Sequence, residues 1–153
     1  WPMIYKEIDE RYPDSKFILT VRKDSEIWWR SMTNHAKRMG PTAERKIIYG
    51  YAWPLGRKKV HVGRYEAHIA EVQSHFQDRP GKLLTICWET GSGWQDITDF
   101  LELPPVAPGT ELPAINVAIG QTISYNKWVR NTTKTVLIST LGFDPFMYRN
   151  FEA

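Results

Sequence analysis

The stretch KFILTVRKDSEIWWRS, residues 16–31, decides the fold. Residues 17–21 are β-formers that are apolar on both faces apart from Thr20, which is typical of a strand covered by helices on both sides of its sheet. From Ser25 onward apolar residues recur every four positions, which predicts a helix that Asp24 or Ser25 can cap. The sequence therefore predicts a buried strand followed at once by a helix.

Two cations, Arg22 and Lys23, stand between this strand and this helix. In an open parallel sheet, ligands bind beyond the carboxyl ends of the strands, where helix N-termini also point and favour anions. This corner is therefore a candidate phosphate site. The alternative is a solvated corner in which Arg22 pairs with Asp24 or Glu26.

The rest of the pattern repeats the same alternation. Further helices are predicted over residues 3–11, 64–76 and about 94–101, and a second strand over residues 82–88. Two buried strands joined by a long helical crossover predict an α/β fold, a three-layer parallel sheet covered by helices. Because two strands are too few for such a sheet, we expect more strands upstream of Trp1.

Composition fits one globular domain over residues 1–153, with 42% hydrophobic residues, a formal charge of +3 and a pI of about 9.0. This charge is too small to predict nucleic-acid binding. The lone Cys87 excludes an internal disulfide framework and favours a reducing, cytoplasmic location. The sequence contains neither a long apolar run for a membrane span nor His or Cys pairs with metal-ligand spacing.

Basic residues are concentrated in residues 37–64, which hold eight Lys or Arg against one Glu, a net charge of +7. Such a region attracts an anionic small molecule or a membrane surface, or it is a solvated face. Residues 117–153 are weakly patterned and are left as an unassigned C-terminal extension.

Two longer segments carry a resemblance. WPMIYKEIDERYPDSKFILTVRKDSEIWWRS, residues 1–31, resembles the middle of a sulfotransferase of the microbial and fungal branch. RYEAHIAEVQSHFQDRPGKLLTICWETGSGWQDITDFLELPPVAPGTELPAIN, residues 64–116, is similar to a later part of the same branch. The resemblance covers residues 1–116, the C-terminal two-thirds of such a domain.

This resemblance implies a P-loop-type α/β domain that transfers a sulfuryl group from 3′-phosphoadenosine 5′-phosphosulfate (PAPS) to a hydroxyl or amine of a small acceptor. It implies that Arg22 and Ser31 bind the 3′-phosphate of PAPS or of its product 3′,5′-ADP. The family's spacing is eight residues, whereas nine separate Arg22 from Ser31, so Lys23 is named beside Arg22. Trp88 takes the position of an aromatic near the adenine, or it is a core tryptophan.

The sequence does not assign the donor loop or the general base, and it leaves two roles open for one turn. The family's donor loop is expected upstream, because no G-x-x-x-x-G-K-[ST] pattern occurs in these residues. The turn TGSG, residues 90–93, is either a phosphate nest or a plain tight turn. Glu89 reads as a turn or helix-start carboxylate, and no histidine is assigned as general base.

Three functions are compatible with these residues. The first is a PAPS-dependent sulfotransferase. The second is a non-catalytic relative that binds a nucleotide, lipid or protein. The third is another P-loop phosphotransferase, such as a small kinase, which would depend on magnesium.

Overall fold

The structure is a computed structural model that describes residues 3–112, 129, 130 and 133. Its contacts divide the described residues into two compact units, one of residues 3–28 and 63–112, the other of residues 29–62, 129, 130 and 133. Two helices, α2 (Ser25–Met39) and α4 (Lys58–Phe76), contribute residues to both units. The expectation of a single domain stays a prediction.

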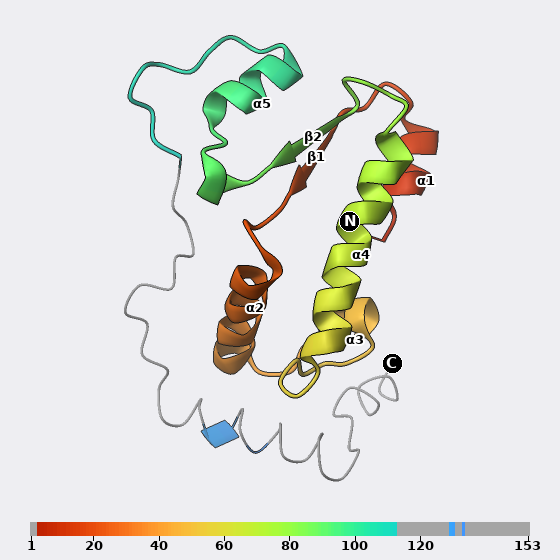
Figure 1. Ribbon diagram of the computed structural model, residues 1–153, viewed down its shortest axis with the longest axis vertical. Helices are drawn as coiled ribbons and strands as arrows, with labels where there is room; N and C mark the ends of the chain where they lie inside the picture. The colour runs from red at the N-terminus through yellow and green to blue at the C-terminus, as the bar shows by residue number, and fades with distance from the viewer. Residues whose placement is uncertain (1–2, 113–128, 131–132, 134–153) are drawn as a thin grey trace, which may run out of the picture. The chain divides into compact units, whose positions relative to one another are not determined.

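The first unit contains a parallel pair of strands, β1 (Phe17–Thr20) and β2 (Leu83–Ile86). Their register pairs Phe17 with Leu83 and Thr20 with Ile86. The N–H of Val21 donates to the carbonyl of Ile86 at 2.8 Å, so the pairing continues one residue past β1. The predicted parallel α/β arrangement is confirmed for this pair, and both strands end at the same edge (Figure 1).

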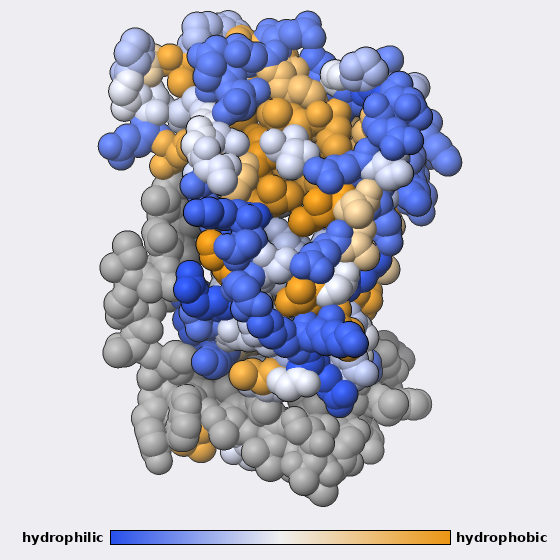
Figure 2. Space-filling model, in the orientation of Figure 1, coloured by the Kyte–Doolittle hydropathy of each residue, from blue (hydrophilic) through white to orange (hydrophobic). Residues whose placement is uncertain are grey.

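Alternate residues of β1 build the core of this unit. Leu19 packs with Val72 and Phe76 of α4, and partly buried neighbours complete the cluster, namely Tyr5, Phe17, Val21, Ile69 and Leu83. Figure 1 shows α4 and α1 (Tyr5–Arg11) on one side of the strands and α5 (Trp94–Leu101), which contacts β2, on the other. Figure 2 shows apolar residues gathered over the strands. Burying such side chains stabilises by roughly 1.5–3 kcal/mol each.

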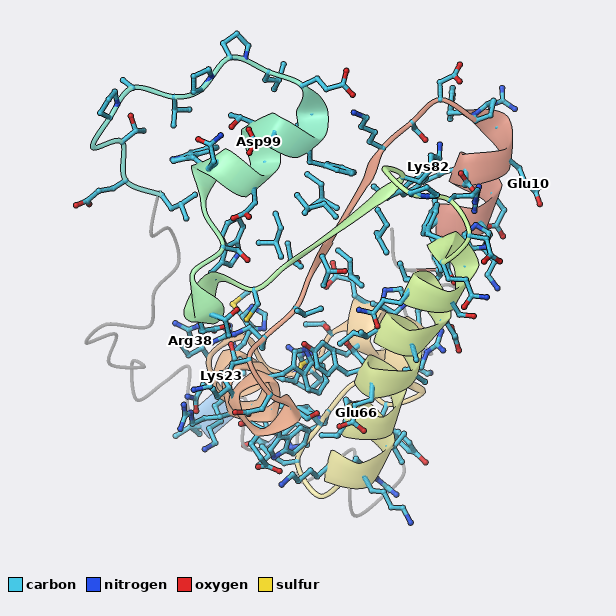
Figure 3. The ribbon with its side chains drawn as sticks, turned by 45° about the horizontal axis from the view of Figure 1, so that its top comes forward. Glu10, Lys23, Arg38, Glu66, Lys82 and Asp99 are labelled. Atoms are coloured by element: carbon cyan, nitrogen blue, oxygen red, sulfur yellow. The ribbon has the colours of Figure 1, made fainter. Side chains whose placement is uncertain are left out.

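A buried carboxylate fastens α1 at the amino edge of the strands. Asp9 is 5% exposed, and its Oδ2 lies 2.6 Å from Arg79 Nη1 and 2.9 Å from His75 Nε2. Lys82 Nζ lies 3.7 Å from Asp9 Oδ1. Lys82 precedes β2 at this edge, while Lys23 follows β1 at the opposite one (Figure 3). The charge cluster is therefore separate from the candidate site.

The second unit holds the remainder of α2, the helix α3 (Ala43–Tyr49) and the first turn of α4. Thr42 caps α3 by accepting from the N–H of Arg45, and Gly50 ends it in the left-handed region at φ +78°. The repeating apolar pattern did not predict α3, because its core-facing residue is a buried arginine, Arg45. The helix α4 also begins earlier than expected, at Lys58, because its first turn lies in the basic stretch and its buried residue there is a histidine, His61.

Candidate functional site

The parallel pairing brings four predicted or noted residues to one edge of the sheet. Arg22 and Lys23 follow β1, and Trp88 and Glu89 follow β2 in a short 3-10 helix, η1 (Trp88–Thr90). Because the carboxyl ends of parallel strands share an edge, residues 66 positions apart become neighbours: the N–H of Lys23 donates to Glu89 Oε2 at 3.3 Å. This edge is the candidate site.

Arg22 is held at two points. Its N–H donates to the hydroxyl of Tyr65 at 2.9 Å, and its Nε forms an ion pair with Glu89 Oε1. The side chain is 38% exposed. Within residues 3–112 no hydrogen bond involves its two terminal nitrogens, which leaves a planar pair of donors for a ligand. The alternative interpretation, in which Arg22 pairs with Asp24 or Glu26, is wrong, because the Arg22 side chain pairs with Glu89.

Glu89 gathers three donors from the corner. Besides Arg22 and Lys23, the thiol of Cys87 donates to Glu89 Oε2 at 3.5 Å. Burial alone would raise the pKa of this carboxyl. The opposing effect is larger: hydrogen bonds from Cys87, Arg22 and Lys23, together with the positive charge of Arg22, hold the pKa below its ordinary value. Glu89 is therefore a charged member of the corner as well as a turn residue.

The start of α2 confirms the predicted cap. Asp24 Oδ1 accepts from the N–H of Ile27 at 2.7 Å, while the hydroxyl of Ser25 donates to Glu66 Oε1 on α4. Figure 3 shows Glu66 on α4. One N–H group of the helix N-terminus thus already donates to Asp24 and is not available to a ligand. Binding of an anion at this corner therefore depends more on the Arg22 side chain than on the helix end.

Tyr65 is a site residue that the sequence pattern placed only on an apolar stripe. Its hydroxyl supports Arg22, and its ring stacks on Trp28 with centroids 4.4 Å apart. The tyrosine lies 43 positions from Arg22, so no local pattern connects the two. The only signal available was its place in the family-like segment beginning RYEAH.

Trp88 is 42% exposed, which makes the interpretation as a core tryptophan wrong and leaves its indole open to a flat ligand. Ser31 is exposed in the second turn of α2 and belongs to the second compact unit. Its pairing with Arg22 across a shared phosphate therefore stays a prediction.

The TGSG segment behaves as a turn in the structure. Gly91 adopts φ +99°, and the N–H of Gly93 donates to Asp96 Oδ2 at 2.7 Å, which completes a capping interaction for α5. An N–H already bonded to a carboxylate is a poor element of a phosphate nest. The geometry favours the plain turn.

The described ring contacts of His61 and His68 are packing contacts within their own units. His61 is fully buried in the second unit, where its ring lies 4.8 Å from that of Tyr49. Its Nδ1 lies 3.0 Å from the carbonyl of Arg57, and burial lowers its pKa. His68 packs edge-on to Tyr5, and burial lowers its pKa as well. None is assigned a catalytic role.

No group of three or more His, Cys, Asp or Glu side chains in the described residues is arranged to hold a metal ion. None of their helices is both long and apolar enough to cross a membrane.

A comparison with known proteins finds a family match for the first part of the chain. Residues 1–62 match the family model described as a sulfotransferase domain. Neither the curated proteins nor the solved structures contain a match to this chain. The matched residues include β1, Arg22, Lys23 and Ser31, while the segment of residues 64–116 lies outside them. The family resemblance seen in the sequence is thus confirmed over residues 1–62, which match the sulfotransferase family.

Proposed function

We propose that this chain is part of a PAPS-dependent sulfotransferase domain and that Arg22 binds the 3′-phosphate of the donor. The observation that carries the proposal is the end of the Arg22 side chain, which no described residue bonds, at the carboxyl edge of two parallel strands and within residues that match the sulfotransferase family. We also propose the fold of the domain, a three-layer, P-loop NTPase-like α/β fold with strands additional to β1 and β2.

The chemistry of the corner fits a phosphate. The two terminal nitrogens of Arg22 match two phosphate oxygens, and such charge-assisted bidentate pairs are among the strongest hydrogen bonds in proteins. The exposed Lys23 adds a second positive charge. The hydroxyl of Ser31 is the proposed second contact, and the indole of Trp88 is the proposed adenine contact.

Bound PAPS would supply the sulfuryl group to a hydroxyl or amine of the acceptor, which would lose its proton, and 3′,5′-ADP would be the leaving group. The residues named here bind and orient the nucleotide; we assign none of them to proton transfer. We propose a small-molecule acceptor, and an anionic one would be attracted by the basic residues 37–64. A cytoplasmic location is also proposed, supported by the single free Cys87.

The test is calorimetric titration of 3′,5′-ADP and 5′-AMP into the full chain and into Arg22→Ala. Losing one bidentate charged contact should weaken 3′,5′-ADP roughly 30- to 100-fold and leave 5′-AMP unchanged. Arg11→Ala, an exposed arginine on α1, is the matched control for loss of one charge. Equal affinities of the wild type for the two nucleotides would contradict the proposal.

The two other candidate functions give different outcomes in the same assays. Binding of 3′,5′-ADP without sulfuryl transfer to any acceptor would indicate a non-catalytic relative. Transfer from a nucleoside triphosphate that stops on addition of a magnesium chelator would indicate a kinase.

A further inference from the structure

Glu89 links the two strand ends of the candidate site. One carboxylate oxygen pairs with Arg22 Nε, and the other accepts from the N–H of Lys23 at 3.3 Å and from the thiol of Cys87 at 3.5 Å. The carboxylate thus contacts the side chain of one predicted phosphate residue and the backbone of the other. Its side chain is 29% exposed, so these contacts are only partly screened by water.

A hydrogen-bonded turn places Glu89 at this position. The N–H groups of Thr90 and Ser92 both donate to the carbonyl of Cys87, at 3.1 and 3.3 Å. The hydroxyl of Ser92 in turn accepts from the N–H of Cys87 at 3.1 Å, and Gly91 provides the left-handed residue that ends η1. The backbone therefore folds back on the end of β2, which fixes the origin of the Glu89 side chain.

We propose that Glu89 is a positioning residue that holds the guanidinium of Arg22 so that its two terminal nitrogens face the 3′-phosphate. This inference rests on the proposed function of Arg22. Because Glu89 occupies Nε, the remaining bidentate edge of the guanidinium is the one formed by the two terminal nitrogens. A phosphate then approaches the end of the side chain rather than its flank.

Positioning matters because an arginine side chain has considerable rotamer freedom. The Arg22 side chain is 38% exposed, and its described side-chain contact is the ion pair with Glu89. Ordering such a side chain on binding weakens affinity, and an existing ion pair removes this cost in advance. The effect belongs to the 3′-phosphate alone, because 5′-AMP has no group at Arg22.

Repulsion between Glu89 and the bound phosphate is expected to be the smaller effect. The positive charge of Arg22 offsets that of the carboxylate, and both carboxylate oxygens already accept from donors of the corner. Removing the carboxylate should therefore lower the preference for a 3′-phosphate rather than raise it.

The experiment measures the ratio of the dissociation constants of 5′-AMP and 3′,5′-ADP in the full chain. We expect Glu89→Gln to lower this ratio about three- to tenfold, because a neutral amide cannot hold both donors. Glu89→Asp, which keeps the charge but is one methylene shorter, should lower it as well. Glu66→Gln removes a nearby carboxylate that bonds Ser25 instead, and should leave the ratio unchanged.

A double variant tests whether Glu89 affects binding of the 3′-phosphate only by positioning Arg22. In an Arg22→Ala background, Glu89→Gln should change the ratio no further. A ratio that stays constant or rises in folded Glu89→Gln overturns the inference, and so does an effect that persists without Arg22. An unchanged ratio in Arg22→Ala alone, or no binding by the wild type, overturns the proposed function instead.

Discussion

The ring of Trp28 stacks on the ring of Tyr65, with 4.4 Å between the centroids and 9° between the planes. The stack joins the first turn of α2 to α4, and the hydroxyl of the same tyrosine accepts from the N–H of Arg22 at 2.9 Å. One side chain thus holds both the helix and the strand end on either side of the candidate phosphate site.

Tyr65→Phe separates these two contacts. The variant keeps the stack but removes the acceptor of a partly buried N–H, so we expect a loss of about 1 kcal/mol in the free energy of unfolding. Tyr65→Leu also removes the stack, and its loss should be larger by about 0.5–1.5 kcal/mol. Urea unfolding followed by far-UV circular dichroism measures both. Equal stability of Tyr65→Phe and wild type would show that the hydrogen bond contributes nothing.

Asp9→Asn should destabilise the chain by about 2 kcal/mol at pH 7. The change leaves Arg79, His75 and Lys82 without their shared carboxylate, and the loss is below the 3–5 kcal/mol of a fully buried pair because Arg79 is 40% exposed. Glu10→Gln, the neighbouring exposed carboxylate on α1, is the control and should change stability little (Figure 3).

The same carboxylate predicts an acid response. Burial alone would raise the pKa of Asp9. The opposing effect is larger: hydrogen bonds from Arg79 and His75, together with the charges of Arg79 and Lys82, hold the pKa below the usual 3.8. The stabilisation is therefore fully present above about pH 4 and is lost as pH falls through the lowered pKa. Unfolding curves between pH 5 and about pH 2 should be less pH-dependent in Asp9→Asn than in wild type. Parallel curves would contradict the assignment.

His61 predicts loss of stability at a higher pH. Burial lowers the pKa of this histidine below 6.5 and the charge of Arg45 lowers it further, against the raising effect of the Arg57 carbonyl. The neutral ring is required in the folded state, so its stabilisation is present above about pH 6.5 and falls as pH drops below that value. Its bond to the Arg57 carbonyl requires the proton on Nδ1, which an asparagine amide can replace.

His61→Asn should therefore be less stable than wild type at pH 7.5, because it loses the ring packed against Tyr49, and the difference should shrink toward pH 5.5. Chemical unfolding at the two pH values measures this. A constant difference would mean that protonation of His61 is not linked to folding.

The local parts of the fold were predictable from the sequence. The strand beginning at Phe17 and the helix beginning at Ser25 each depend on a few adjacent residues, and both were predicted. The cap was predicted at Asp24 or Ser25, and the structure has it at Asp24. The parallel pairing followed from the length of the crossover between two strands whose sequences are apolar on both faces. The expected burial of both faces was wrong for β1, because the structure buries Leu19 and leaves Ile18 40% exposed. In these elements, the spacing of apolar residues predicted both the position of the element and whether it is a strand or a helix.

The partners of the site residues could not be predicted, because they depend on contacts between distant positions. Arg22 meets Tyr65 from 43 positions away, and Glu89 joins the corner from 66 positions beyond Lys23. Local charge spacing instead suggested Asp24, which serves the helix cap. Only the register of β1 and β2 determines which residues share the edge.

Trp88 provides a last prediction, in which the base and the phosphate are tested separately. The indole is 42% exposed beside Glu89, so a proposed stack on adenine would involve the part that 5′-AMP and 3′,5′-ADP have in common. Trp88→Ala should weaken both nucleotides equally, by about tenfold, since base stacking contributes about 1–3 kcal/mol. Trp88→Tyr, which keeps a flat ring, should retain most of the affinity. Arg22→Ala should act on 3′,5′-ADP alone, so a loss confined to one nucleotide in Trp88→Ala would place the indole at the phosphate and not at the base.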